Sequence, residues 1–86
     1  MLYKVKINLS KSADSLNKIG MVEMSKKPYW VSVEAPDPDD ACAAAVKKVN
    51  TAINAAFSSL SISSSKVEKY TDEAIVNMRI TEIKEV

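Results

Sequence analysis

Few residues of this sequence carry side chains that do catalytic chemistry. The 86 residues include no His and a single Cys, Cys42. Without His there is neither imidazole acid–base catalysis nor a His-ligated metal site, and one Cys forms no intramolecular disulfide and no multi-Cys zinc site. The chain also has only one Gly, which excludes a glycine-rich phosphate-binding loop. We therefore expect a protein that is not an enzyme and that uses no cofactor.

Cys42 and an acidic cluster are the remaining candidates for chemistry. Cys42 lies on the apolar stripe of a predicted helix, and a thiol buried in apolar surroundings is inert. The acidic cluster consists of Glu34 and an acidic knob, Asp37, Asp39 and Asp40. Calcium loops arrange their ligands around a glycine turn, which is missing here, and the positions of the knob residues are those of helix-capping aspartates. We expect no metal site, although a surface acidic knob would also suit a basic partner.

One long helix is predicted to begin at Asp37 and to end at residues 58–60. Asp37 has the position of an N-cap residue, and Pro38 suits the first helical position because its missing N–H has no partner there. The residues that follow repeat apolar side chains at spacings of three and four, typical of one helical face. This stripe comprises Cys42, Val46, Val49, Ile53, Ala56 or Phe57, and Leu60.

Three segments alternate apolar and polar residues and are predicted to be strands: residues 2–9, 29–35 and 76–81. In the last of these the alternation changes phase near residues 81–83, which predicts a β-bulge or the end of pairing. Residues 10–28 favour a fourth strand at 19–24 entering a turn at 25–28, with a short helix from Ala13 as the competing interpretation. Residues 61–73 are rich in Ser and charge, which indicates a surface connection with a short strand near 66–70.

These elements predict one small α+β domain over residues 1–86, in the order β-β-β-α-β. An antiparallel sheet of three or four strands would carry one long helix on one face. Because a single helix covers only one side of a sheet, the other side would face water or a partner. The candidate binding residues on that uncovered side are Lys4, Lys6, Trp30, Ser32, Asn77 and Arg79, with Asn8, Glu34, Ile75 and Thr81 beside them.

Charge is unevenly distributed along the chain although the net charge is only +1. Residues 1–27 contain six Lys against Asp14 and Glu23, whereas the remainder contains more acidic than basic residues. A polarised small protein is oriented by a charged partner and associates with it faster.

Three functions fit these features. The first is a non-catalytic protein-binding module, which could inhibit or modulate a larger host protein; Trp is enriched in protein interfaces. The second is a nucleic-acid-binding module, since Trp among Lys and Arg on a bare sheet can stack on bases and neutralise phosphates. The third is a structural subunit of a homo-oligomer, a homodimer for example, with the uncovered face buried against a second copy.

In element order and size the predicted domain resembles small one-helix α+β proteins, including some ribosomal proteins, antitoxins and phage-encoded inhibitors of host machinery. No sequence motif supports any one of these groups. The first residues alternate charged and apolar side chains, unlike a signal peptide, no segment is apolar enough to cross a membrane, and a lone Cys fits a reducing compartment. We expect a cytoplasmic protein that does not contact a membrane.

Overall fold

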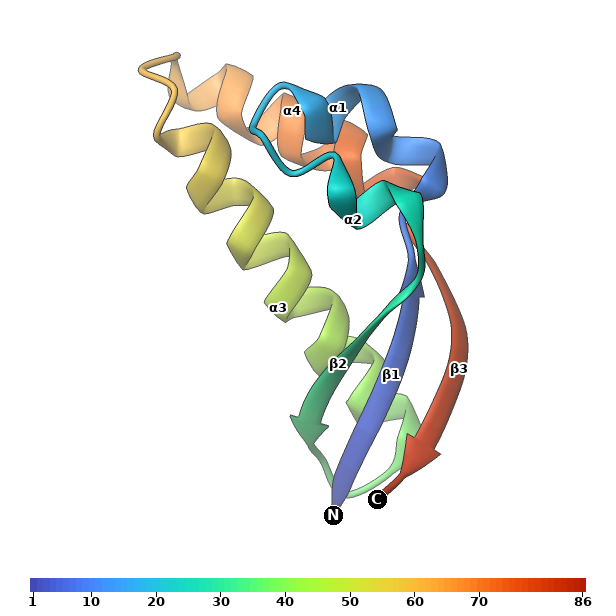
Figure 1. The fold of residues 1–86 in the computed structure, drawn as a ribbon. Helices are drawn as coiled ribbons and strands as arrows, with labels where there is room; N and C mark the ends of the chain where they lie inside the picture. The colour runs from blue at the N-terminus through green and yellow to red at the C-terminus, as the bar shows by residue number, and fades with distance from the viewer.

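A three-stranded antiparallel sheet forms one half of the molecule. The computed structural model describes all 86 residues. The sheet has the order β2-β1-β3, with β1 (Leu2–Asn8) between β2 (Tyr29–Glu34) and β3 (Arg79–Glu85). The predicted α+β class, with a small antiparallel sheet and one long helix on one face, is confirmed (Figure 1).

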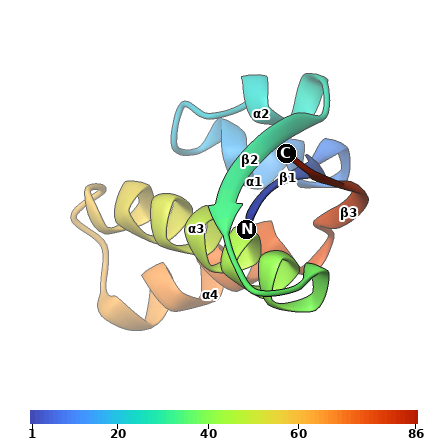
Figure 2. The same ribbon diagram turned by 90° about the horizontal axis from the view of Figure 1, so that it is seen from below.

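The long helix, α3 (Pro38–Ser58), lies where the sequence predicts it. Asp37 is its N-cap residue, and the Asp37 Oδ1 atom accepts a hydrogen bond of 2.8 Å from the Asp40 backbone N–H. This bond satisfies one of the N–H groups that a helix start leaves without a partner. Figures 1 and 2 show α3 crossing one face of the sheet and running on past its end.

The buried stripe of α3 is rotated from the predicted one. It consists of Ala41, Ala45, Val49, Ile53 and Phe57, so Cys42 lies at its edge, half-buried, and Leu60 is exposed. The small Ala41 and Ala45 side chains allow the helix to approach the strands closely. The larger Ile53 and Phe57 side chains lie farther along, where α3 packs against a second helix described below instead of the sheet.

Residues 10–28 form three short helices and no strand, so the predicted strand over 19–24 is wrong. The helices are η1 (Ser10–Ser12), α1 (Ala13–Asn17) and α2 (Glu23–Lys26). Gly20 has a φ of 70°, and the Met21 N–H donates to the Leu16 carbonyl at 2.9 Å, the pattern of a helix ended by a left-handed residue. Gly20 therefore terminates α1, which makes the competing helix interpretation the correct one.

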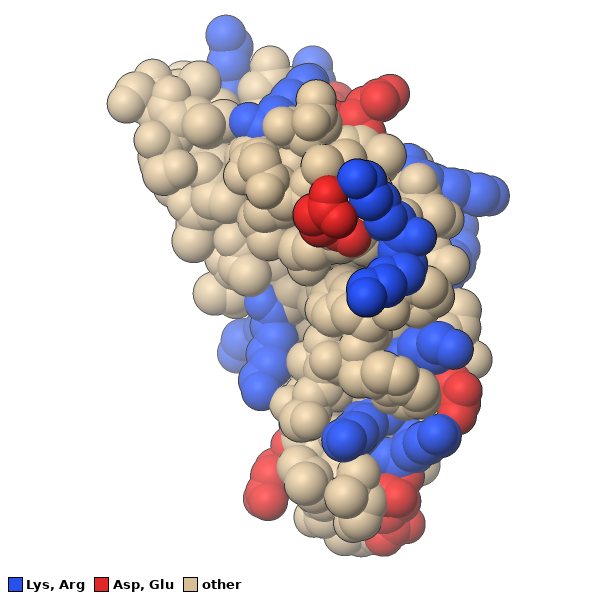
Figure 3. Space-filling view, viewed as in Figure 1, with Lys and Arg blue, Asp and Glu red and all other residues tan.

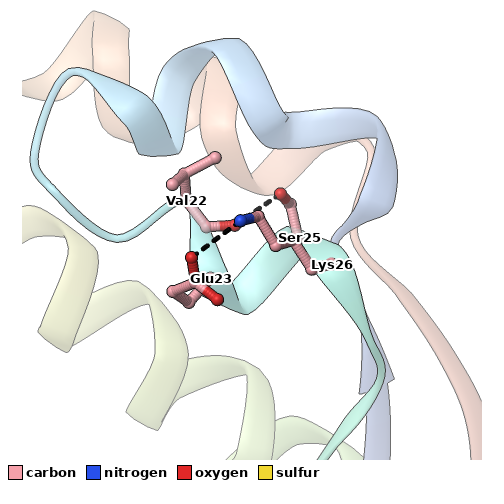
Figure 4. A network of polar contacts seen from close by, with 4 residues as sticks. All are labelled: Val22, Glu23, Ser25 and Lys26. Carbon is pink, nitrogen blue, oxygen red and sulfur yellow. Dashed lines mark hydrogen bonds and ion pairs between the residues drawn. The ribbon is translucent and has the colours of Figure 1, made fainter.

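The single turn of α2 is held by local polar contacts. The Ser25 hydroxyl donates to the Val22 carbonyl at 2.6 Å, and Lys26 Nζ lies 2.9 Å from Glu23 Oε1 (Figure 4). The ion pair is exposed, and such pairs contribute little stability. A buried contact anchors the beginning of the segment, since the Ser12 hydroxyl donates to the Ala74 carbonyl at 2.6 Å.

The serine-rich segment after α3 contains a second helix, α4 (Ser64–Val76), where the sequence predicts a connection with a short strand. Ser63 caps it, and the buried residues Val67, Thr71 and Ala74 follow at helical spacing. Tyr70 of α4 packs on Phe57 of α3, with ring centroids 5.7 Å apart. The strands and longer helices therefore follow the order β-β-α-α-β instead of β-β-β-α-β.

The last strand begins three residues later than predicted because α4 continues through Val76, whose side chain is exposed. Lys6 pairs with Glu82 and Ile7 pairs with Ile80, so Thr81 is an extra residue in β3. The predicted irregularity at residues 81–83 is therefore a β-bulge, after which the pairing continues.

One contiguous apolar core joins the two halves of the molecule. Its buried side chains come from the inner face of β1 and β2, from α3, and from the helices at the far end of the sheet. The molecule is elongated, with extents of 39 × 24 × 17 Å. None of its helices is both long enough and apolar enough to span a bilayer.

Candidate functional site

The sheet has one face that no helix covers, termed the open face here. In β1, Tyr3, Val5 and Ile7 are buried against α3, so the intervening residues point to the opposite side. The register places the residues paired with them on the same side. The open face therefore comprises Leu2, Lys4, Lys6, Asn8, Trp30, Ser32, Glu34, Arg79, Glu82 and Lys84.

Trp30 lies at the centre of a group of cations on this face. It pairs directly with Lys6 across the β1–β2 ladder, and the Lys6 Nζ atom is 5.7 Å from the centroid of the indole ring. The Lys84 Nζ atom, from the far strand β3, is 5.1 Å from the same centroid. The three side chains thus span the width of the sheet, and Trp30 remains 39 % exposed.

The positive charge of the open face is only partly compensated. Four residues of the open face are basic and two are acidic: Lys4, Lys6, Arg79 and Lys84 against Glu34 and Glu82. Lys84 Nζ lies 3.6 Å from a Glu82 carboxylate oxygen, and the only other ion pair of the molecule is the one in α2. The Lys4 and Lys6 ammonium groups therefore have no carboxylate within ion-pairing distance. Figure 3 shows basic side chains along the strands on this side of the molecule.

A shallow hollow of about 390 Å³ lies beside Trp30. It is lined by Lys4, Trp30, Lys84, Glu85 and Val86. The Val86 N–H donates to the Leu2 carbonyl at 2.8 Å, which makes Leu2 and Val86 cross-strand neighbours, and both side chains are exposed. The hollow combines ammonium groups with apolar side chains.

The structure brings most of the predicted binding residues together. Lys4 and Lys6 lie on the central strand β1, and their partners Ser32 and Trp30 lie beside them on β2. Arg79 lies at the end of the open face, where it pairs with Asn8. The Arg79 guanidinium donates to the Val76 and Met78 carbonyls, at 3.2 and 2.8 Å.

Three residues of the predicted surface lie outside the open face, and one of them, Thr81, is the bulged residue of β3. Asn77 is the C-cap residue of α4, and with Asn8 and Arg79 it lines a second hollow at the rim of the sheet. Ile75 belongs to α4 and is half-buried. The positions of Asn77 and Ile75 follow from the late beginning of β3.

Lys84 and Glu82 were missed in the sequence because the predicted strand ended at residue 81. A signal for them is present. Ile83 continues the inward-facing positions after the bulge, so its neighbours on both sides must point outward.

The acidic knob lies apart from the open face, at the start of α3. Its Asp37 carboxylate is engaged in the capping bond, and no three His, Cys, Asp or Glu side chains of the molecule are grouped closely enough to hold a metal ion.

The outer edge of β2 receives a contact from α3. Lys48 Nζ donates to the Ser32 carbonyl at 2.8 Å. Since Ser32 is an edge residue whose carbonyl points away from β1, the lysine occupies an acceptor that the sheet leaves free.

The largest concavity of the molecule lies between α3 and α4 and measures about 620 Å³. Its lining is mostly polar, with Asn50, Asn54 and Ser58 on α3 and with Glu68, Thr71 and Asp72 on α4. It contains no basic side chain and no nucleophile with an adjacent base.

No protein-family model, curated protein or solved structure matches this chain. The function must therefore be inferred from the residues of the open face themselves.

Proposed function

We propose that this protein is a non-catalytic binding module that attaches to another protein through its open face and thereby inhibits or modulates it. The observation that carries this proposal is the position of Trp30, an aromatic side chain that is 39 % exposed on the uncovered face of the sheet, with the Lys6 and Lys84 ammonium groups over its ring.

Energetic considerations support Trp30 as the anchor of such an interface. A large aromatic side chain buries much apolar area while losing few rotamers, and Trp is enriched among the residues that dominate binding energies. The Trp30 ring already contacts the Lys6 and Lys84 ammonium groups in the free protein. Its side chain therefore loses little conformational entropy on binding. Burial of the exposed part of its ring against a partner would then yield net affinity.

Capture from a lysate of the protein's own host tests the proposal. The tagged protein and its Trp30→Ala variant are compared after nuclease treatment, and captured proteins are identified by mass spectrometry. We expect a protein that is retained by the native chain and lost from the variant. Lys47→Glu serves as the control because Lys47 lies on the exposed side of α3, away from the open face. Equal capture by all three chains would contradict the proposal.

Nucleic acid is the second candidate, and the same cluster favours it, since an aromatic ring with adjacent cations can bind single strands. Capture that disappears after nuclease treatment would support this alternative. Affinity for a single-stranded oligonucleotide would then fall linearly with the logarithm of salt concentration.

The cytoplasm is the proposed location, because Cys42 would remain a reduced thiol there.

A further inference from the structure

We propose that the open face binds an acidic segment of the partner protein, whose carboxylates lie on Lys4, Lys6 and Lys84 while an adjacent apolar side chain packs on Trp30 and Val86. This inference rests on the proposed function and specifies the chemistry of the partner.

Charge complementarity is the first argument. The three ammonium groups come from adjacent strands, since Lys4 and Lys84 are direct cross-strand partners and Lys6 follows Lys4 on the same side. Only Lys84 has a carboxylate within 4 Å, at 3.6 Å. Like charges held this close together repel one another in the free protein, so a carboxylate bound among them relieves repulsion as well as adding attraction.

The apolar side chains beside the lysines are the second argument. Leu2, Trp30 and Val86 are 37 %, 39 % and 67 % exposed, and Trp30 and Val86 line the same hollow as Lys4 and Lys84. A ligand that carried only negative charge would leave these side chains in water. A peptide with an aliphatic or aromatic residue next to its acidic residues would pair with the ammonium groups of the hollow and also contact its apolar side chains.

The charged side chains around the indole ring favour a peptide over a nucleic acid as the ligand. Lys6 and Lys84 both lie over the ring, so a base that stacked flat on it would have to displace an ammonium group, whereas an apolar side chain can pack on the part of Trp30 that is still exposed. A carboxylate binds the ammonium groups where they already are. Glu82 and Glu85 also flank the cluster and repel any negative charge placed next to them. A peptide avoids this repulsion when its carboxylates are spaced to meet the lysines only, which the evenly charged backbone of a nucleic acid cannot do.

The test uses a random short-peptide library displayed on phage and the full-length protein. The library is selected on the native protein after depletion on the double variant Lys4→Glu/Lys84→Glu. A second selection uses Lys47→Glu/Lys66→Glu, which makes the same change of net charge at exposed positions of α3 and α4. Circular dichroism confirms that both variants are folded. We expect enriched peptides that combine acidic with apolar residues, on the native protein and on the second variant but not on the first.

Trp30 then reports binding directly, because it is the only Trp in the chain. Titration with a selected peptide should shift its fluorescence emission to shorter wavelength and saturate. Replacing the acidic residues of that peptide by Gln or Asn should weaken binding about tenfold, and Lys4→Glu/Lys84→Glu should weaken it by at least as much. Binding should also weaken as salt screens the charges.

Three outcomes would overturn the inference. Face-dependent peptides that are neutral or basic would contradict the acidic partner while leaving the proposed function standing. Tighter binding of a single-stranded oligonucleotide than of any selected peptide would contradict both. The absence of any peptide that distinguishes the native protein from Lys4→Glu/Lys84→Glu would likewise contradict both.

Discussion

Trp30 and Phe57 are two large aromatic residues with opposite environments. Phe57 is fully buried between the helices, whereas Trp30 is 39 % exposed on the open face. Trp30→Ala should therefore lower the free energy of unfolding by only about 1 kcal/mol, the size of a cross-strand contact. Phe57→Ala should cost about 3–5 kcal/mol. Urea denaturation followed by circular dichroism measures both, and a loss of several kcal/mol in Trp30→Ala would mean that the indole belongs to the core.

Tyr29 is a neighbour of Trp30 in sequence but points to the other side of the sheet. Its hydroxyl oxygen is buried and has no hydrogen-bond partner, and an unsatisfied buried hydroxyl is destabilising. Tyr29→Phe should therefore raise the free energy of unfolding by about 1 kcal/mol. Chemical denaturation at neutral pH measures this change, and a destabilised variant would contradict the burial of an unpaired hydroxyl.

The same residue predicts a pH dependence. Burial raises the pKa of Tyr29 from 10.0 to about 12, because the charged phenolate is poorly solvated in the core. Between these values the unfolded chain loses the Tyr29 proton and the folded chain keeps it, so this contribution to stability is complete below pH 10 and is lost as pH rises toward 12. Denaturation series across this range should show a steeper loss for the native protein than for Tyr29→Phe. Parallel curves would contradict the raised pKa.

At the scale of the elements, Gly20 determines where α1 ends. Its φ of 70° is strained for residues with a Cβ atom, although a Cβ built there would have open space around it. Gly20→Ala should therefore cost about 1 kcal/mol from backbone conformation alone. Gly20→Asn should cost less, since Asn tolerates the left-handed region better. Thermal denaturation of the two variants compares them, and equal stability of Gly20→Ala and the native protein would contradict this role.

The sequence predicted those elements whose own residues determine them. The helix beginning at Asp37 carries its capping residue, its proline and its apolar repeat in one segment, and β1 and β2 show strict alternation. These local signals agree with the tertiary packing, so the approximate bounds of the three elements and the buried sides of the two strands were predictable. The buried stripe of the helix was predicted with a rotation, because apolar residues also lie beside the stripe that packs.

The mispredicted elements are those whose local signals are ambiguous. Gly is a poor helix former, so Gly20 counts against a helix in its segment, although it lies just beyond α1 and ends it. Ser63 belongs to a run of serines that resembles a loop, yet it is the N-cap of α4, and only Val67, Thr71 and Ala74 indicate the helical face. A stripe of three residues that includes Thr is recognisable only once its packing surface is known.

The open face was predictable in outline because strand alternation determines it. Lys4, Lys6 and Trp30 followed from the pattern of β1 and β2. The position of Lys84 could not be predicted in this way, because the bulge at Thr81 reverses the alternation, so the rest of β3 no longer follows the period of two that precedes it.

At the scale of the whole molecule, the one contiguous core predicts that the chain unfolds in one step. The buried cluster includes residues from the strands and from the helices beyond the sheet, so neither half retains a core without the other. The transitions followed by far-ultraviolet circular dichroism and by Trp30 fluorescence should therefore coincide on heating. Since the proposed function requires a free open face, light scattering after size exclusion should give the monomer mass of 9.4 kDa. A dimer with a buried Trp30 would instead support the homo-oligomer hypothesis.

The contact of Lys48 with Ser32 makes the two margins of the sheet unequal. Exposed strand margins recruit other strands and so promote aggregation, and charged side chains discourage this. On the outer edge of β2, Lys48 binds the carbonyl of Ser32. The outer edge of β3 has no such contact, and only the charged residues of the strand itself discourage pairing there: Arg79, Glu82, Lys84 and Glu85. Fibril formation by this protein would therefore begin at β3, and replacing its charged residues by neutral ones is the change that would promote it.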